Sequence, residues 1–267
     1  MSMPKAVSAS PPTHHGSRSF IMAKRTRLDT KLVARGVFET RQQALRAIMA
    51  GEVRIGDHVA TKASMLVAET AEISVTQRSR YVSRGGLKLE GALAHFHVTC
   101  RGKLALDIGA STGGFTDCLL QHGARKVYAI DVGHGQLAWK IRSDPRVVVR
   151  EKINARNLSR NEIPEPVDVC VIDVSFISLT LILPNAFDLI TPDGVILALI
   201  KPQFELQRKD VGRGGIVQSA ELHQKAQRKI SDFVAGLGHA VFGIVPSQIT
   251  GTDGNQEFFA CLRKRLG

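Results

Sequence analysis

Strand-length apolar segments alternate with helical segments over residues 103–262, and this alternation constrains the fold more than any other feature. The strand candidates are Leu104–Ile108, Val127–Val132, Val147–Val149, Val167–Val174, Val195–Ile200, Ala240–Val245 and Phe258–Leu262. Helical periodicity marks Leu87–Phe96, Gly114–Gln121, Leu179–Ile190 and Ala220–Leu237. Such alternation predicts an α/β fold with a parallel sheet covered by helices on both faces. Only a loop separates the last two strands, so we expect that pair to be antiparallel.

A smaller unit precedes this alternation. Residues 1–22 are rich in Ser, Pro and His without periodicity, and we expect them to be a disordered extension. Residues 24–80 hold two short helical patterns, and Glu52–Asp57 reads as a strand and a turn. Gly36 suits a left-handed cap of the first helix, and Thr40–Gln43 fits a capping box that opens the second. This unit is predicted to be a small α+β domain.

The net charge of the chain indicates which class of partner it binds. The 267 residues carry a formal net charge of +12, and nine basic residues stand against four acidic ones between Lys24 and Lys62. The basic residues sit between apolar positions, as on one face of a folded unit. This pattern favours a structured nucleic-acid-binding module, and a protein that merely happens to be basic remains the alternative.

Composition also bears on compartment and assembly. Four cysteines stand far apart with no CxxC motif, which favours buried thiols in the reducing cytoplasm. No stretch approaches the ~20 apolar residues of a spanning helix, and we expect no membrane partner. We expect a monomer. Trp139, the single tryptophan, lies at helical spacing, and we expect it to be packed in the core or half-buried.

The first strand of the larger unit runs into a glycine-rich turn and then a helix over Leu104–Thr116. A doubly wound sheet binds its cofactor at such a turn. Neither a P-loop nor GxGxxG is present. Asp107 suits the positive amino group of S-adenosylmethionine, and Asp131 after the next strand suits ribose hydroxyls; a nicotinamide cofactor stays an alternative. The candidate cofactor-binding residues are Asp107, Gly109, Ser111, Gly113, Gly114, Phe115, Asp131, Asn154 and Asp173.

Charged residues end two neighbouring strands of the predicted sheet. Asp173 follows one strand and Lys201 follows the next. Burying them beside the cofactor turn is costly unless they are paired or used. Lys88 and Glu257 are candidates to join them, so that the catalytic set reads Lys, Asp, Lys, Glu. A structural ion pair is the alternative.

Two resemblances sharpen these predictions. Residues 25–80, through Arg27-Leu28-Asp29, Leu32–Gly36 and Gly51-Glu52-Val53, resemble the S4 RNA-binding domain. The four charged residues around the glycine-rich turn resemble the FtsJ-like ribose 2′-O-methyltransferases. With the S4-type domain in front, residues 24–265 resemble the TlyA family, also called hemolysin A. Further matching segments are Ser83–Gly86, Asp107–Phe115, Asp131–Leu137, Asn154–Arg156, Asp173–Phe176 and Lys201–Glu205.

The resemblance implies a fold, an activity and a division into domains. It implies a Rossmann-like methyltransferase domain over residues 87–267, with a seven-stranded sheet whose last strand is antiparallel. An S4-like domain over 24–80 and a linker over 81–86 would precede it. It implies S-adenosylmethionine-dependent 2′-O-methylation of cytidine in 16S or 23S ribosomal RNA, or both. The expected RNA-binding residues are Lys24, Arg25, Arg27, Arg41, Arg46, Arg80, Tyr81 and Arg84.

The residue types fit this chemistry. A ribose hydroxyl is a poor acid, and a lysine placed among other charges can be neutral in part and accept its proton. Lys201 is the candidate base. Lys88 and Asp173 would orient Lys201 and the hydroxyl, and Glu257 would hold Lys88 or the ribose. We expect no metal. Two other function classes remain open: a noncatalytic ribosome assembly factor that binds RNA, and a membrane-lysing protein.

Overall fold

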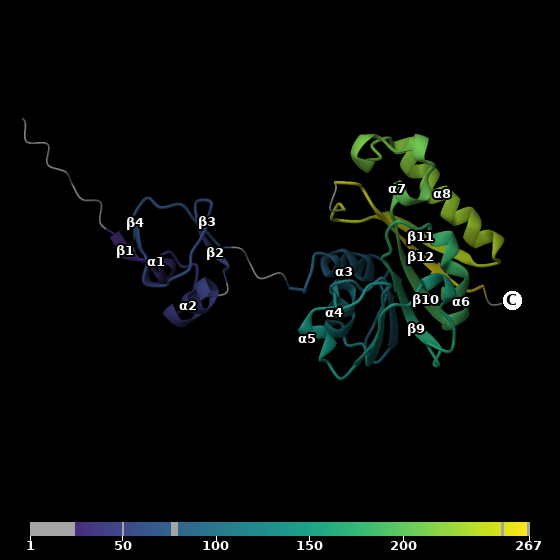
Figure 1. Cartoon of the computed structure of the whole chain (residues 1–267), viewed down its shortest axis with the longest axis horizontal. Helices are drawn as coiled ribbons and strands as arrows, with labels where there is room; N and C mark the ends of the chain where they lie inside the picture. The colour runs from purple at the N-terminus through teal and green to yellow at the C-terminus, as the bar shows by residue number, and fades with distance from the viewer. Residues whose placement is uncertain (1–24, 50, 76–79, 252–253, 266–267) are drawn as a thin grey trace, which may run out of the picture. The chain divides into compact units, whose positions relative to one another are not determined.

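The computed structural model describes residues 25–49, 51–75, 80–251 and 254–265. The chain divides into two compact units, residues 1–78 and 79–267, which we describe separately (Figure 1). The predicted disordered extension over residues 1–22 lies outside the described residues.

The first unit packs two helices against short strands. Its helices are α1 (Leu28–Ala34) and α2 (Arg41–Met49), and its strands are β1 (Arg25–Arg27), β2 (Val53–Ile55), β3 (His58–Val59), β4 (Leu66–Ala68) and β5 (Ile73–Val75). In the described part, β3, β2 and β5 form one antiparallel sheet and β1 pairs with β4. The core centres on Leu28, Leu32, Ile48 and Val53.

Both helix signals in the first unit are confirmed. Gly36 follows α1 with a φ of +69°, the left-handed conformation that glycine adopts without strain. The backbone N–H of Gln43 donates to the Thr40 hydroxyl at 3.2 Å, and the backbone N–H of Thr40 donates to the Gln43 side-chain oxygen at 3.3 Å. This reciprocal pair is the capping box that the sequence predicts for α2.

The second unit is built on one mixed sheet. Its strands are β6 (Leu104–Ile108), β7 (Lys126–Ile130), β8 (Val147–Arg150), β9 (Val167–Ile172), β10 (Ile190–Ile200), β11 (Ala240–Pro246) and β12 (Phe258–Arg263). Among the described residues these seven strands lie in the order β11-β12-β10-β9-β6-β7-β8. β12 runs antiparallel to both of its neighbours, whereas β8, β7, β6, β9 and β10 pair in parallel. The predicted antiparallel final pair is confirmed.

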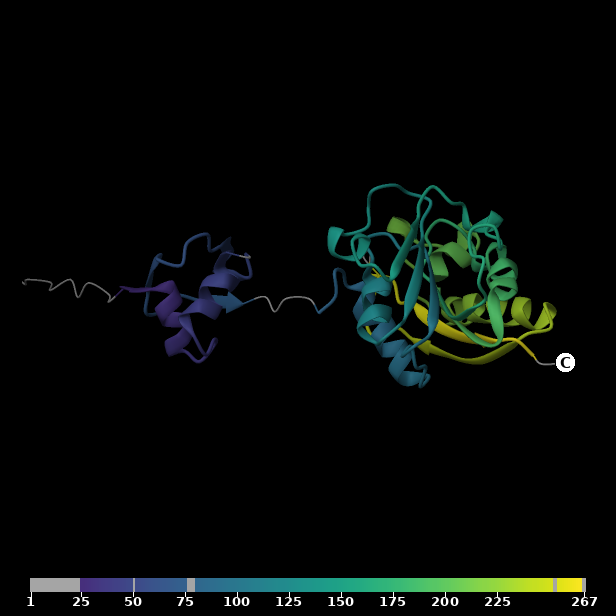
Figure 2. The ribbon, with the colours of Figure 1, turned by 90° about the horizontal axis from the view of Figure 1, so that it is seen from below.

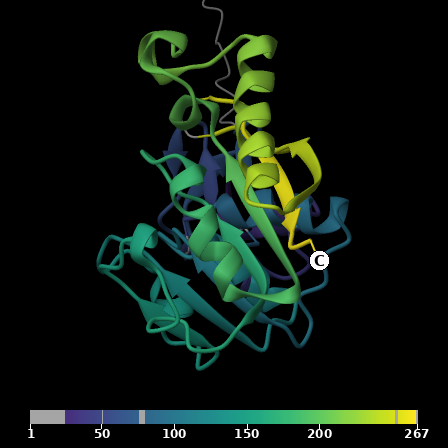
Figure 3. The same cartoon turned by 90° about the vertical axis from the view of Figure 1, so that its right-hand side faces the viewer.

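Helices cover both faces of this sheet (Figures 2 and 3). One face carries α3 (Gly85–His95), α4 (Gly114–Gln121) and α5 (Trp139–Arg142); the other carries α6 (Leu183–Leu189) and α8 (Ala220–Gly236). Leu104, Leu106 and Ile108 of β6 point into the α6–α8 core, whereas Ala105 points into the opposite core. This alternation follows from the two-residue period of a strand. The carboxyl ends of the parallel strands therefore share one edge.

Two features differ from expectation. The segment expected to be one helix over residues 179–190 is a 3₁₀ turn at Leu179–Leu181 followed by α6, and β10 already begins at Ile190. Trp139 is 78% exposed, so the expected core or half-buried packing is wrong. Trp139 opens α5, a helix of four residues, and Ile141 makes the core contact of that helix instead.

Candidate active site

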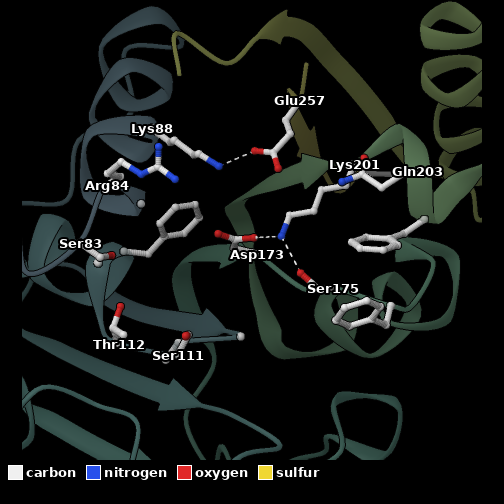
Figure 4. A pocket seen from close by; sticks show the side chains of 17 residues that line it. Ser83, Arg84, Lys88, Ser111, Thr112, Asp173, Ser175, Lys201, Gln203 and Glu257 are labelled. Carbon is white, nitrogen blue, oxygen red and sulfur yellow. Dashed lines mark hydrogen bonds and ion pairs between the residues drawn. The ribbon is translucent and has the colours of Figure 1, made fainter. Parts of the chain in front are cut away.

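Asp173 and Lys201 meet at the carboxyl edge of the sheet. Each directly follows its strand, and because β9 and β10 are parallel neighbours both residues leave the sheet at the same edge. The Lys201 Nζ lies 2.7 Å from Asp173 Oδ1 and donates a hydrogen bond to the Ser175 hydroxyl at 2.9 Å (Figure 4). The expected pair therefore forms, with Ser175 as an additional partner.

Lys88 and Glu257 form a second pair facing the first. Lys88 lies on α3, and Glu257 immediately precedes β12. The Lys88 Nζ lies 2.5 Å from Glu257 Oε2, and the Glu257 side chain is buried. All four charged residues line one pocket of about 330 Å³, so the fold brings together what is far apart in the sequence (Figure 4).

The glycine-rich turn after β6 forms another wall of this pocket. Gly109 has a φ of +89°, and a β-carbon there would overlap the carbonyl oxygen of Asp173. Gly113, with a φ of +95°, is the N-cap of α4, and a β-carbon on Gly114 would overlap the Ser83 hydroxyl. Only glycine lets the turn approach both neighbouring segments so closely.

An adjoining hollow of about 590 Å³ shares Gly109, Ser111 and Asp173 with the first pocket. Asp131 and Asn154, two of the residues that the sequence analysis proposes for cofactor binding, line it. Both carboxylate oxygens of Asp131 accept backbone N–H groups at 2.7 Å, from Ser111 and from Gly133. Each oxygen keeps a further lone pair for a ligand hydroxyl. Asn154 accepts the N–H of Arg156 at 3.1 Å.

Asp107 lies beneath the turn and is fully buried. The Thr116 hydroxyl donates to its Oδ2 at 2.6 Å, and its Oδ1 has no hydrogen-bond partner among the described residues. Burial raises the pKa of Asp107 to about 7. A buried carboxylate oxygen without a donor favours a nearby cationic group. Phe115, expected beside the ligand, is buried, lines the first pocket and packs against Phe259.

Further residues, which the sequence does not single out, line the pocket at the same strand ends. Phe176 is 89% exposed, has a φ of +64° and lines both hollows. Its ring centroid lies 5.0 Å from that of Phe204. Gln203 lines the first pocket, and its side-chain oxygen is buried without a partner in the described part of the chain. The available signal in the sequence was that these residues closely follow Asp173 or Lys201. The exposure of Phe176 was not expected, because an apolar side chain after a buried strand usually points inward.

The expected RNA-binding residues of the second unit fall into different environments. Arg84 is exposed and lines the first pocket. Arg80 forms an ion pair with Glu90. Tyr81 is 2% exposed and belongs to the core on the α3–α4 face, so it does not suit the RNA contact expected of it. The expected linker over 81–86 contains this buried residue and the start of α3.

In the first unit, Arg25 is exposed, and two other expected residues share one carboxylate. Arg27 and Arg41 each place a guanidinium nitrogen 2.9 Å from Asp29 Oδ2. Asp29 is buried, and these contacts hold its pKa below its usual range. Lys24 and the side chain of Arg46 lie outside the described residues.

Three further features of the described residues bear on other kinds of site. Within the described ranges, no three His, Cys, Asp or Glu side chains cluster as metal ligands. In that same part of the chain, no helix is long and apolar enough to cross a membrane. All four cysteines, each of which the structure describes, are free and buried.

Comparison with known proteins assigns the family. The pattern of the FtsJ-like methyltransferases matches residues 81–264, and that of the S4 domain matches residues 26–73. The chain belongs to the FtsJ-like methyltransferase family. This FtsJ-like methyltransferase is 45% identical to the 16S/23S rRNA (cytidine-2′-O)-methyltransferase TlyA of Mycobacterium tuberculosis, over 91% of each chain. It is also 43% identical to Hemolysin A of Brachyspira hyodysenteriae, over 88% of this chain and 98% of that protein.

A solved structure agrees with both units. The structure described as "Putative hemolysin from Streptococcus thermophilus" shares 42% identity with this FtsJ-like methyltransferase. It matches with a TM-score of 0.69 over 91% of this chain and 89% of its own. The similarity to TlyA and to hemolysins therefore spans the S4 domain and the methyltransferase domain together.

Proposed function

We propose that this FtsJ-like methyltransferase transfers a methyl group from S-adenosylmethionine to the 2′-hydroxyl of cytidine in 16S or 23S ribosomal RNA, in the cytoplasm. The observation that carries the proposal is the Lys201–Asp173 pair, at 2.7 Å, beside the glycine-rich turn. The Lys88–Glu257 pair in the same pocket completes a charged set suited to a ribose hydroxyl. The relatives named TlyA supply the nucleotide and the RNA class.

The residues around the turn fit S-adenosylmethionine. The adjoining hollow offers Asp131 for ribose hydroxyls and Asn154 near an adenine. The partnerless Oδ1 of Asp107 suits a positively charged amino group carried close to the turn. When bound, the cofactor supplies a methyl group on a positively charged sulfur. The methyl group is therefore already activated for transfer.

The chain itself has to position and deprotonate the hydroxyl. The Lys201 Nζ donates to the Ser175 hydroxyl and lies beside Asp173 Oδ1, and in the neutral form of the amine its lone pair is left for the proton of the ribose hydroxyl. Lys201 accepts the proton as the oxygen attacks, and Asp173 stabilises the ammonium that forms. Lys88, fixed by Glu257, lies where it can donate to the ribose. Alignment of the ribose oxygen with the methyl group supplies much of the rate enhancement.

Two observations support RNA binding by the first unit: its match to the S4 domain and its exposed basic residues. In the methyltransferase domain, Arg84 adds a positive charge at the pocket. The residues proposed to contact RNA are Lys24, Arg25, Arg27, Arg41 and Arg46 in the S4 domain and, separately, Arg80 and Arg84 in the methyltransferase domain. Tyr81 is left out because it is buried.

Transfer of tritiated methyl to ribosomal subunits lacking this modification tests the proposal. Small subunits, large subunits and naked rRNA are assayed with wild type and with Lys201→Ala. Lys103→Ala is the matched control, because Lys103 lies at the opposite, amino edge of the sheet and is paired with Asp168. We expect label in RNA with wild type and Lys103→Ala, and no label with Lys201→Ala, which still binds cofactor.

Other outcomes are equally decisive. Near wild-type transfer by Lys201→Ala would remove Lys201 from the mechanism. Bound cofactor without label on any ribosomal substrate would contradict the proposed reaction and favour a noncatalytic assembly role or a transfer RNA substrate.

A further inference from the structure

A buried carboxylate outside the catalytic set connects the two strand ends that carry Asp173 and Lys201. Glu205 is the last residue of α7 (Pro202–Glu205), the single turn that follows Lys201, and it is 5% exposed. It does not line the pocket with Lys201 and Asp173, so the mechanism leaves it unused. A carboxylate buried this deeply is costly unless it is fully paired.

The partners of Glu205 come from the segment that leaves β9. Its Oε2 accepts the Ser178 hydroxyl at 2.5 Å, and its Oε1 accepts the backbone N–H of Leu179 at 2.7 Å. Ser178 lies three residues beyond Ser175 and five beyond Asp173. Glu205 therefore bridges the turn after Lys201 to the segment that carries both partners of the Lys201 amine.

A lysine from α8 closes this bridge. The Lys229 Nζ lies 2.9 Å from Glu205 Oε2, and it also donates to the Glu205 carbonyl oxygen at 2.7 Å and to the Ser178 hydroxyl at 3.1 Å. Figure 1 shows α8 running past α7 at this edge of the second unit. One ammonium group thus holds both segments at once.

We propose that Glu205 and Lys229 are positioning residues, which set the contact between Lys201 and Asp173–Ser175 by fixing the ends of β10 and β9 against each other. The inference rests on the proposed function, in which that contact prepares the base. Without Lys229 the buried carboxylate lacks its counter-charge and turns toward water or takes up a proton. Either change loosens Ser178 and, through it, Asp173 and Ser175.

Single-turnover methylation at saturating cofactor and RNA tests this role. We expect Lys229→Met to lower the rate about 10- to 100-fold, the size of effect that a displacement of about 1 Å produces. Cofactor and RNA affinities should stay within about twofold of wild type, because neither residue lines a pocket. Lys229→Arg, which keeps the charge, should recover most of the rate, and Glu205→Gln should add little to Lys229→Met because the pair acts as a unit.

Lys225→Met is the matched control. Lys225 lies one turn earlier on α8 and forms a 2.6 Å ion pair with Asp210, away from both strand ends. It should leave the rate unchanged. A Lys229→Met rate equal to that of Lys225→Met would overturn the inference. So would a parallel loss of rate, cofactor affinity and thermal stability that Lys229→Arg fails to recover, because that is the signature of a structural role.

A second readout needs no methylation. In ¹³C-lysine-labelled full-length protein, the Lys201 signal is assigned from its absence in Lys201→Ala. It should move in Lys229→Met and stay in place in Lys225→Met, whereas an unmoved signal overturns the inference. If wild type methylates no ribosomal RNA while the signal moves, the proposed function fails and the positioning role stands.

Discussion

Phe176 is the residue whose environment departs furthest from what its type prefers. A large apolar side chain that is 89% exposed on a left-handed backbone needs a reason, and such strain clusters at functional sites. It borders the pocket of Lys201, where an aromatic ring can stack on the base whose ribose is methylated.

This placement predicts a specific loss in Phe176→Ala. Base stacking on an aromatic ring is worth about 1–3 kcal/mol, so kcat/KM for RNA should fall about 5- to 150-fold. Phe176→Trp, which keeps a stacking ring, should retain most activity. Because the ring also lines the adjoining hollow, cofactor affinity, measured by calorimetry, should fall less than kcat/KM for RNA. A loss of cofactor affinity as large as the loss of kcat/KM would contradict a role in stacking on the base.

Asp107 predicts a pH dependence of cofactor binding. Its raised pKa of about 7 means that the carboxyl group is largely neutral at pH 6 and largely charged at pH 8. A cationic amino group is attracted only by the charged form, so affinity for S-adenosylmethionine should rise with pH across this range. Calorimetric titration of wild type and Asp107→Asn tests this, and an equally steep rise in Asp107→Asn would contradict it.

The sequence indicates the charged residues of the site better than their contacts. Asp173 and Lys201 are predictable because each follows a buried parallel strand, and parallel neighbours end at one edge. That Lys88 pairs with Glu257 depends on where α3 and β12 come to lie, which no local pattern specifies. The role of Glu205 cannot be predicted from the sequence for the same reason, because its partners come from two other segments.

At the scale of elements, periodicity and capping chemistry carry most of the prediction. Each predicted strand of the larger unit is present, because the strands of a sheet covered on both faces leave apolar runs bounded by polar turns. The early start of β10 is not predictable from periodicity, since Ile190 is followed by Thr, Pro, Asp and Gly and the pairing with β9 shifts register there. Strands β1, β3 and β4 of the first unit are too short to be recognised from the sequence.

The two helices of the first unit are joined through Asp29, and this predicts a local acid sensitivity. Asp29 lies in the first turn of α1, and Arg41 opens α2. Because its folded-state pKa is lowered, its contribution is complete above the unfolded pKa of about 4 and declines as the pH falls toward the folded value. Asp29→Asn should therefore lower the stability of this unit at pH 7. On acidification the variant should lose less stability than wild type. Hydrogen exchange of residues 28–48 in the full chain measures both.

A matched variant keeps this prediction specific. Asp144→Asn breaks an ion pair with Arg146 in the other unit and should leave exchange in residues 28–48 unchanged. Equal protection of α1 and α2 in Asp29→Asn and wild type, at neutral and acidic pH, would show that Asp29 does not join them.

At the scale of the whole molecule, the excess of twelve positive charges predicts RNA affinity that falls with salt. Arg41 is a poor probe of this, because reversing its charge also breaks the contact with Asp29. Arg25 and Lys62 are exposed, so Arg25→Gln with Lys62→Gln removes two charges at little structural cost. The slope of log affinity against log salt should fall by about 1.4 to 1.8, with the single-turnover rate at saturating RNA unchanged. Lys103→Gln with Lys225→Gln removes the same charge from the methyltransferase domain. If both pairs flatten the slope equally, net charge rather than the S4 domain governs RNA binding.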